Sequence, residues 1–211
     1  MTNPITVYHI PRSRSMRVLW LLEELGLPYE VDSLDYVPGK FGGDAYSKIH
    51  PLNKVPAVKD GDVVMFESVA IMQYILNTYG PNHGVSGKLA PAVDDPEYGP
   101  YLQWLHYGES TLAPVIAALM YQRHFFPEEK RSTHMVEWAE AELVKVFSML
   151  ETQLGDHEYI LKSGFSAADI SVGYCLLLAR LAKAHDQITD RIEDYWESLT
   201  DRDAWLKISK M

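Results

Sequence analysis

The sequence contains a single cysteine, Cys175, and this scarcity excludes several kinds of protein. One cysteine cannot form an intrachain disulfide, and it cannot supply the Cys-x-x-Cys pair of a dithiol redox enzyme. None of the eight histidines has a partner at metal-ligand spacing, so we expect no metal site. Because Cys175 falls in an apolar stretch, we expect it to be a small, buried core residue.

Long apolar runs and an excess of positive charge are also absent. No segment approaches the ~20 apolar residues that span a bilayer, and the longest candidate, residues 174–182, is interrupted by Arg180. The first residues lack a charged segment followed by an apolar one, so we expect no secretory signal and a cytoplasmic location. The chain carries 19 Lys and Arg against 29 Asp and Glu, a formal net charge of −10. We therefore expect no nucleic-acid or membrane partner, because both select for basic surfaces.

The most informative stretch that is present covers residues 54–71. Asp60-Gly61 between β-branched residues predicts a β-hairpin, because glycine supplies the positive φ of a tight turn. The apolar period then becomes helical, with Ser68 at the expected N-cap and Glu67 just before it. A helix start binds carboxylates well and an acidic neighbour can hold an ammonium group. This pair therefore fits the head group of an α-amino acid, although it also fits a plain helix start.

The first 82 residues alternate between strand and helix patterns. Strands are predicted over residues 5–10 and 29–35, with a helix between them that closes at Gly26. A short helix is expected at about residues 45–49. Together with the hairpin and its closing helix, these elements predict an α/β layer of about four strands, which resembles a thioredoxin fold.

The remainder of the chain is predicted to be helical. Residues 83–97 are rich in Gly, Pro and Asp and are interpreted as a linker to an all-helical domain over residues 98–211. A long helix over residues 101–122 is expected to kink at Pro114. An amphipathic helix is predicted over residues 133–154.

A sequence motif typical of a helix N-terminus marks the centre of this second domain. Ser166 and Asp169 have the spacing of a capping box, and Phe165 can pack on Ile170. The helix that follows, residues 167–184, is apolar nearly all round, so we expect it to be buried. The tail carries Trp205 and Leu206, which we expect to pack back onto the helical domain.

Two of these motifs carry a resemblance to a known family. Val55-Pro56, followed eleven residues later by Glu67-Ser68, resembles the glutathione-binding half of cytosolic glutathione S-transferases, in particular bacterial and fungal serine-type or theta-like members. The Ser-x-x-Asp capping box is similar to one in the C-terminal domain of the same family. The resemblance implies an α/β N-terminal thioredoxin-like domain plus an all-α C-terminal helical domain, a homodimer, and glutathione as co-substrate without a metal.

The resemblance also implies which residues hold glutathione. The Pro of the Val-Pro pair is cis in this family, the preceding residue pairs its backbone with the cysteinyl unit, and the Glu-Ser pair holds the γ-glutamyl end. Two lysines are candidates for the glycine carboxylate. The implied glutathione-binding residues are Lys40, Lys54, Val55, Pro56, Glu67 and Ser68.

Glutathione chemistry requires a thiolate, because a free thiol with a pKa near ~8.5 is mostly protonated at pH 7. In serine-type members the activating hydroxyl lies about four residues before an Arg, which selects Ser13 with Arg17. Ser15 is the competing candidate, and Arg14 is a candidate cationic stabiliser. Either serine could instead be only the N-cap of the following helix. Tyr8 is a further competitor, because other classes use a Tyr hydroxyl, but its place in a strand favours core packing.

The predicted function is glutathione S-transferase activity on small electrophiles, with a role in detoxification. We expect the second-substrate pocket between the domains, and Tyr107 is its candidate residue. One alternative is a glutathione-dependent isomerase, dehalogenase or peroxidase at the same site. Another is a non-catalytic binding or scaffold protein, since fold does not determine function.

Overall fold

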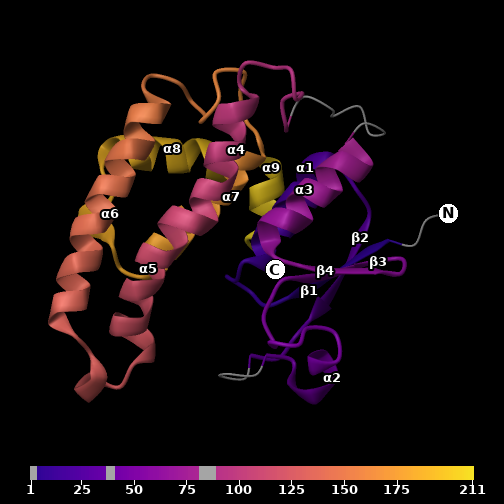
Figure 1. Ribbon diagram of the computed structural model, residues 1–211, viewed down its shortest axis with the longest axis horizontal. Helices are drawn as coiled ribbons and strands as arrows, with labels where there is room; N and C mark the ends of the chain where they lie inside the picture. Colours follow the sequence, from indigo (N-terminus) through magenta and orange to yellow (C-terminus); the bar gives the residue numbers. More distant parts are fainter. Residues whose placement is uncertain (1–3, 37–40, 81–88) are drawn as a thin grey trace. The chain divides into compact units, whose positions relative to one another are not determined.

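The computed structural model describes residues 4–36, 41–80 and 89–211, and the chain divides into two compact units (Figure 1). The first unit combines residues 1–86 with residues 203–211, and the second comprises residues 87–202. This division differs from the predicted one at the end of the chain, because the last helix belongs to the first unit.

The first unit is built on a four-stranded sheet. Its strands are β1 (Ile5–His9), β2 (Tyr29–Ser33), β3 (Ala57–Asp60) and β4 (Val63–Phe66). They lie in the order β2-β1-β3-β4, with β1 and β2 parallel and the other neighbours antiparallel. In Figure 1, α1 (Ser15–Leu25) and α3 (Ser68–Tyr79) lie on one side of the sheet and α2 (Gly43–Ser47) on the other. The predicted thioredoxin-like layer is confirmed.

A single row of paired residues crosses this sheet and brings three connections together. Tyr8 of β1 pairs with Ala57 of β3, and Ala57 pairs with Phe66 of β4. Just beyond the row, β1 leads toward α1, β3 is entered from Val55, and β4 leads into α3. The segments that carry the candidate glutathione-binding residues therefore meet at one edge of the sheet.

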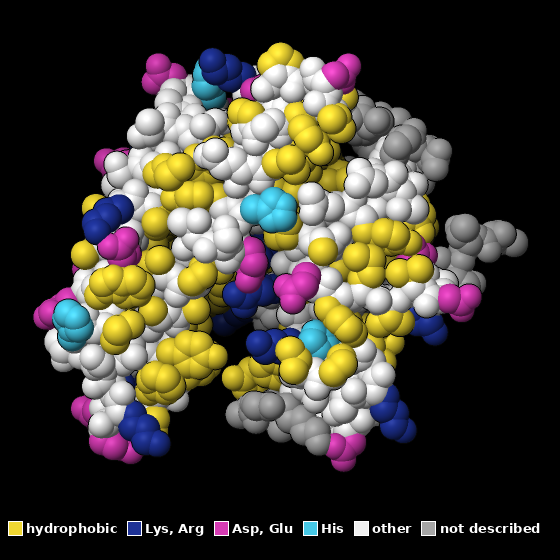
Figure 2. Space-filling model, viewed as in Figure 1, with side chains coloured by type: hydrophobic (Ala, Val, Ile, Leu, Met, Phe, Trp, Pro, Cys, Tyr) yellow, Lys and Arg dark blue, Asp and Glu magenta, His cyan; other side chains and the backbone are white. Residues whose placement is uncertain are grey.

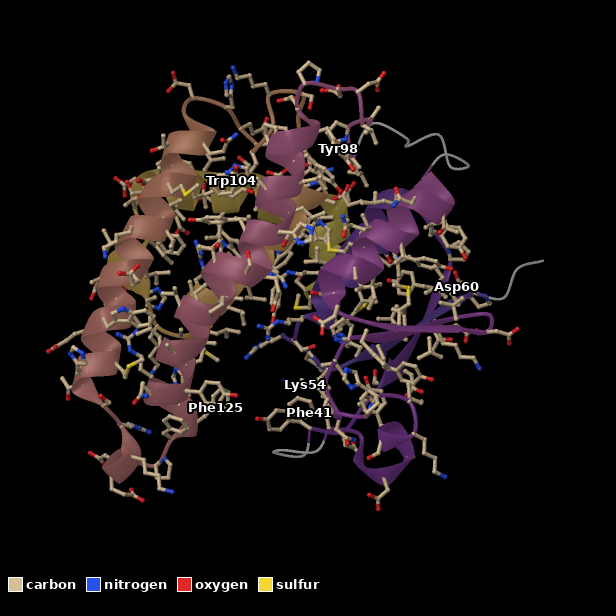
Figure 3. All side chains as sticks on the ribbon, in the orientation of Figure 1. Phe41, Lys54, Asp60, Tyr98, Trp104 and Phe125 are labelled. Atoms are coloured by element: carbon tan, nitrogen blue, oxygen red, sulfur yellow. The ribbon has the colours of Figure 1, made fainter. Side chains whose placement is uncertain are left out.

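The opposite end of the sheet is closed by the hairpin turn. Asp60 lies there, away from Lys54 at the other end of the segment (Figure 3). Its carboxylate accepts hydrogen bonds from the hydroxyls of Tyr74 and Tyr79 at 2.8 and 2.6 Å. These two bonds tie the hairpin to α3, so this end of the sheet is structural.

The final helix, α9 (Asp203–Ile208), packs on α1 within the first unit. The ring of Trp205 lies 4.8 Å from that of Trp20, and Lys207 Nζ lies 2.7 Å from Glu23 Oε1. The prediction that Trp205 and Leu206 pack on the helical domain is therefore wrong: Trp205 covers α1, and Leu206 is 46% exposed. The local sequence pattern identified both residues as apolar, but it did not indicate that α1 covers Trp205 or that Leu206 stays exposed.

The second unit is helical throughout its regular elements. These are α4 (Tyr98–Tyr107), η2 (Gly108–Leu112), α5 (Ala113–Met120), η3 (Tyr121–Phe125), η4 (Glu128–Lys130), α6 (Thr133–Leu154), α7 (Ala167–Leu181), η5 (His185–Gln187) and α8 (Asp190–Thr200). The predicted helix over residues 101–122 is interrupted by π-helical turns, η2 and η3. The first precedes Pro114, whose ring lacks the N–H that an α-helical ladder needs.

The buried centre of this unit is α7, as predicted. The capping box is present: Ser166 N–H donates to Asp169 Oδ2 at 2.8 Å, and Ser166 Oγ accepts from Ala168 N–H at 3.3 Å. Asp169 Oδ1 accepts two further hydrogen bonds, from Ile160 N–H and Tyr195 O–H, both at 2.9 Å. Complete burial raises the pKa of Asp169, although these donors oppose the shift. This carboxylate joins three segments of the unit.

Gly108, in the π-helical turn η2, lies close to Ser171 and Cys175 of α7. A Cβ at this position would lie 2.6 Å from the backbone oxygen of Ser171 and 2.5 Å from its Oγ. The carbonyl of Gly108 also accepts a hydrogen bond from Cys175 Sγ at 2.9 Å, so the predicted buried cysteine is tied to the same contact.

Replacing Gly108 with alanine is expected to lower the free energy of unfolding by about 1–3 kcal/mol, the usual cost of overpacking. Urea denaturation followed by circular dichroism measures it. The matched control is Gly99→Ala in α4, where a Cβ meets nothing within 4 Å, so stability should be unchanged or rise by about 0.5–1 kcal/mol. Equal stability of the two variants would contradict the proposed close packing.

Candidate functional site

The segment before β3 presents a backbone that is free to pair. The Val55-Pro56 peptide bond is cis, as the resemblance implied. The carbonyl of the preceding Lys54 is occupied, because Tyr46 O–H donates to it at 2.7 Å. Within the described residues, no hydrogen bond engages the N–H or C=O of Val55. An extended peptide could therefore pair with Val55 as an added strand does.

Asn53 fixes the approach to this segment. It adopts a positive φ of 48°, which asparagine tolerates better than most residues. Its side-chain amide donates to the carbonyls of Phe41 and Gly43 at 3.0 and 3.1 Å, and its Oδ1 accepts from Ser47 Oγ at 2.9 Å. The segment is thus anchored to α2.

The start of α3 differs from the prediction by one residue. Ser68 is the first helical residue, and Glu67 takes the N-cap position with a positive φ of 68° and no capping hydrogen bond. A non-glycine residue in this region costs about 1–3 kcal/mol, which the surrounding structure must offset. The Glu67 carboxylate is exposed and, among the described residues, makes no hydrogen bond. It is therefore available to a ligand.

Arg17 determines the direction of the Ser68 hydroxyl. Its side chain is completely buried, and Nη1 donates to Ser68 Oγ at 3.2 Å. A guanidinium can only donate, so Ser68 Oγ is the acceptor and keeps its own proton for another partner. The first N–H groups of α3 favour an anion at this point.

The loop before α1 brings both candidate serines together. Ser13 Oγ lies 2.6 Å from Ser15 Oγ, which in turn lies 2.7 Å from Nδ1 of His9. Ser15 is completely buried, whereas Ser13 is half-buried. Neither serine caps the helix, because Arg14 occupies the N-cap position without a side-chain hydrogen bond to it.

The remaining predicted residues of the first unit differ in their exposure. Arg14 is half-buried and Lys54 is exposed, while Lys40 lies outside the described residues. Tyr8 belongs to the core, with its ring centroid 5.4 Å from that of Tyr46, and burial raises its pKa. Core packing of Tyr8 was the favoured interpretation.

Tyr107, the candidate residue for the second-substrate pocket, is buried within the helical unit. Its side chain is buried, and its hydroxyl donates to the carbonyl of Val146 at 3.0 Å within the helical unit. Burial raises the pKa of Tyr107 to about 12. The side chain is therefore a packing residue of the helical unit, with its hydroxyl already paired.

Two histidines of the first unit were not singled out from the sequence. His9 ends β1 and is 2% exposed, and burial lowers its pKa. His50 packs on Phe66 with ring centroids 4.2 Å apart, and its Nδ1 accepts from Leu52 N–H at 3.1 Å. Burial lowers the pKa of His50, while the charge of Glu67 opposes the shift. No local pattern identifies either residue, because each takes its environment from distant segments.

The described residues contain neither a metal-binding cluster nor a membrane-spanning helix. Among them, no group of three or more His, Cys, Asp or Glu side chains could hold a metal ion. In the same part of the chain, no helix combines the length and apolar character that crossing a membrane requires.

Comparison with known proteins agrees with this arrangement. Residues 3–77 match the family described as "Glutathione S-transferase, N-terminal domain". Glutathione S-transferase 3 of Schizosaccharomyces pombe is 40% identical over 114 residues, which cover 54% of this chain and 45% of that protein. Glutathione S-transferase F10 of Arabidopsis thaliana is 30% identical over 219 residues, covering 97% of this chain and 96% of that protein.

Solved structures extend the likeness to the whole fold. Poplar glutathione transferase F1 superposes with a TM-score of 0.85 at 27% identity, covering 99% of this chain and 98% of that one. The transferase URE2P6 of Phanerochaete chrysosporium, solved in complex with oxidized glutathione, gives a TM-score of 0.84 at 26% identity, covering 98% and 94%. The fold, the arrangement of the site and the full-length relatives agree: this chain belongs to the glutathione S-transferase family.

Proposed function

We propose that this protein is a serine-type glutathione transferase in which Ser13 stabilises the glutathione thiolate for attack on a small electrophile. The observation that carries the proposal is the gathering of Ser13, Val55, Glu67 and Ser68 at one edge of the sheet, beyond the row from Tyr8 to Phe66. Among the described residues, the backbone of Val55 and the carboxylate of Glu67 make no hydrogen bonds, so both remain available to such a ligand.

Each part of glutathione has a matching group. The γ-glutamyl carboxylate accepts hydrogen bonds from Ser68 Oγ–H and from the first N–H groups of α3, while Arg17 orients the Ser68 hydroxyl. The γ-glutamyl ammonium pairs with Glu67. The cysteinyl unit pairs with the backbone of Val55, which places its sulfur near the loop that carries Ser13. Lys54 and Lys40 are assigned to the glycine carboxylate.

The reaction follows from this placement. The bound thiol releases its proton to solvent, and Ser13 Oγ donates a hydrogen bond to the sulfur anion. The thiolate then forms a bond to an electrophilic carbon, and either a leaving group departs with its electron pair or a conjugated double bond accepts the pair and a proton. Lowering the thiol pKa by about two units requires roughly 2.7 kcal/mol of preferential stabilisation of the anion, within the range of one or two charge-assisted hydrogen bonds.

We further propose a cytoplasmic, homodimeric enzyme with a detoxifying role and no nucleic-acid partner. The net charge of −10 supports the last point. On the face shown in Figure 2, Lys and Arg side chains are scattered among acidic and apolar ones rather than gathered in one continuous patch. The helical unit is assigned the electrophile. Isomerase, dehalogenase or peroxidase activity at the same site would use the same thiolate, and substrate screens distinguish these reactions.

A titration of bound glutathione tests the proposed function. We expect the protein to be retained on immobilised glutathione and the ultraviolet absorbance of the thiolate to titrate with a pKa about 1–2 units below the free value of ~8.5. Glu67→Gln is the matched variant: it removes the charge that pairs with the ammonium and should weaken retention. Retention with an unshifted thiol pKa would favour a binding or scaffold protein instead.

A further inference from the structure

A continuous chain of hydrogen bonds connects the core of the first unit to the loop before α1. His9 Nδ1 lies 2.7 Å from Ser15 Oγ, and Ser15 Oγ lies 2.6 Å from Ser13 Oγ. His9 is 2% exposed and Ser15 is completely buried, whereas Ser13 is half-buried at the end of the chain. Only the last group can therefore reach a ligand.

The direction of these hydrogen bonds decides whether the Ser13 hydroxyl can donate to a ligand. Ser15 has one hydroxyl proton, so it donates either to Ser13 or to His9, since the carbonyl of Ile10, at 3.5 Å, is a weak competitor. Because a hydroxyl both donates and accepts, the choice at Ser15 fixes the choice at Ser13. The outer hydroxyl then presents either a proton or a lone pair to the sulfur.

In the inward direction, Ser13 donates to Ser15 and Ser15 donates to His9 Nδ1. Ser13 then has no proton for a thiolate. The neutral imidazole carries its proton on Nε2, which is buried and has no partner within the described residues. Among backbone groups, buried N–H donors without partners are rarer than unpaired acceptors, and the same desolvation cost applies to a ring N–H.

In the outward direction, His9 Nδ1–H donates to Ser15, and Ser15 donates to Ser13. Ser13 Oγ also accepts from the N–H of Ser15, at 3.4 Å. Both lone pairs of Ser13 then face donors, so its own proton points away from them. Burial lowers the pKa of His9 and keeps the ring neutral, which leaves the proton on Nδ1 and a lone pair on Nε2. Each hydrogen bond in such a row strengthens the next.

We propose that His9 and Ser15 are positioning residues that hold the Ser13 hydroxyl in the outward direction, so that it donates to the glutathione thiolate. The inference rests on the proposed function, in which Ser13 is the group that touches sulfur. His9 acts only through Ser15 and Ser13, and it gains no proton during the reaction.

Two substitutions of His9 separate the effect of its N–H donor from the effect of its side-chain size. His9→Phe keeps a ring and removes both nitrogens, whereas His9→Asn places an amide N–H near the position of Nδ1. We expect His9→Phe to raise the pKa of the bound glutathione thiol by about 0.5–1 unit, and the rate below that pKa to fall about three- to tenfold. The KM for glutathione should change less than twofold. His9→Asn should restore most of the shift.

The same substitution in a Ser13→Ala variant shows whether His9 changes the thiol pKa through Ser13. In Ser13→Ala, His9→Phe should cause no further change in the thiol pKa. An equal shift in both backgrounds, or an unchanged thiol pKa in a folded His9→Phe variant, would overturn the relay. The proposed function fails separately, if the wild-type protein itself leaves the thiol pKa unshifted. Circular dichroism and thermal melting establish that each variant is folded.

Discussion

Replacing Asp169 with alanine is expected to lower the free energy of unfolding by about 2–6 kcal/mol, because it strips the acceptor from two buried backbone N–H groups at roughly 1–3 kcal/mol each. Those groups belong to Ile160 and Ser166, and the hydroxyls of Ser166 and Tyr195 lose the same acceptor. The carboxylate connects the start of α7 to α8, through Tyr195, and to the segment before α7, through Ile160. Guanidinium denaturation measures the loss.

Three comparisons isolate the cause of that loss. Asp169→Asn should also destabilise, because its amide N–H₂ must face the N–H of either Ile160 or Ser166. Tyr195→Phe removes one donor and leaves the acceptor in place, so it should cost only about 0.5–1.5 kcal/mol. The exposed Asp156, replaced by alanine, should change stability by less than about 0.5 kcal/mol. If Asp169→Ala were as stable as Asp156→Ala, the network would contribute nothing.

The largest expected effect on activity comes from Ser13→Ala. Removing the hydrogen bond to sulfur should raise the pKa of the bound thiol by about 1–2 units. The rate near pH 6.5 should therefore fall about 10- to 100-fold, at or below the lower limit of the range for one preorganised donor. The loss should shrink as the pH rises through the new thiol pKa, because the thiolate then forms without help. Steady-state rates across this pH range, with glutathione saturating, measure the effect.

Two further serine variants test the assignment. Ser15→Ala should reduce the rate less than Ser13→Ala, because it removes a donor to Ser13 rather than the donor to sulfur. Ser198→Ala, at a half-buried position of α8 where the hydroxyl donates to the Asp194 carbonyl of the same helix, should leave the rate unchanged. A normal rate for Ser13→Ala together with a loss for Ser15→Ala would assign the thiolate to Ser15 instead.

Elements whose signals are local could be predicted from the sequence. Asp60-Gly61 marks the hairpin, and Ser166 and Asp169 mark the start of α7, because each set of groups satisfies its partners within a few residues. The order of the strand and helix patterns then gives the α/β layer. The likeness of Val55-Pro56 and Glu67-Ser68 to a known family gave the candidate ligand.

The contacts that shape the site depend on distant residues and could not be predicted in the same way. Arg17 meets Ser68 across 51 positions, and nothing in the spacing of α1 indicates that an arginine is wholly buried there. In the sequence, His9 is only one residue of a predicted strand. Its contact with Ser15 depends on how the loop between them folds. Tyr107 occupied a plausible helix position, but its orientation is decided by α6, which carries Val146.

The packing of α9 on α1 has a consequence for the order in which the protein forms during synthesis. Trp20 and Glu23 can meet Trp205 and Lys207 only after the whole second unit has been made. The sheet and its neighbouring helices can assemble earlier, but with the indole of Trp20 incompletely covered. Because domains usually fold as they emerge from the ribosome, the first unit is begun before the second and completed after it. A nascent chain stalled before residue 203 therefore exposes an apolar surface that chaperones recognise.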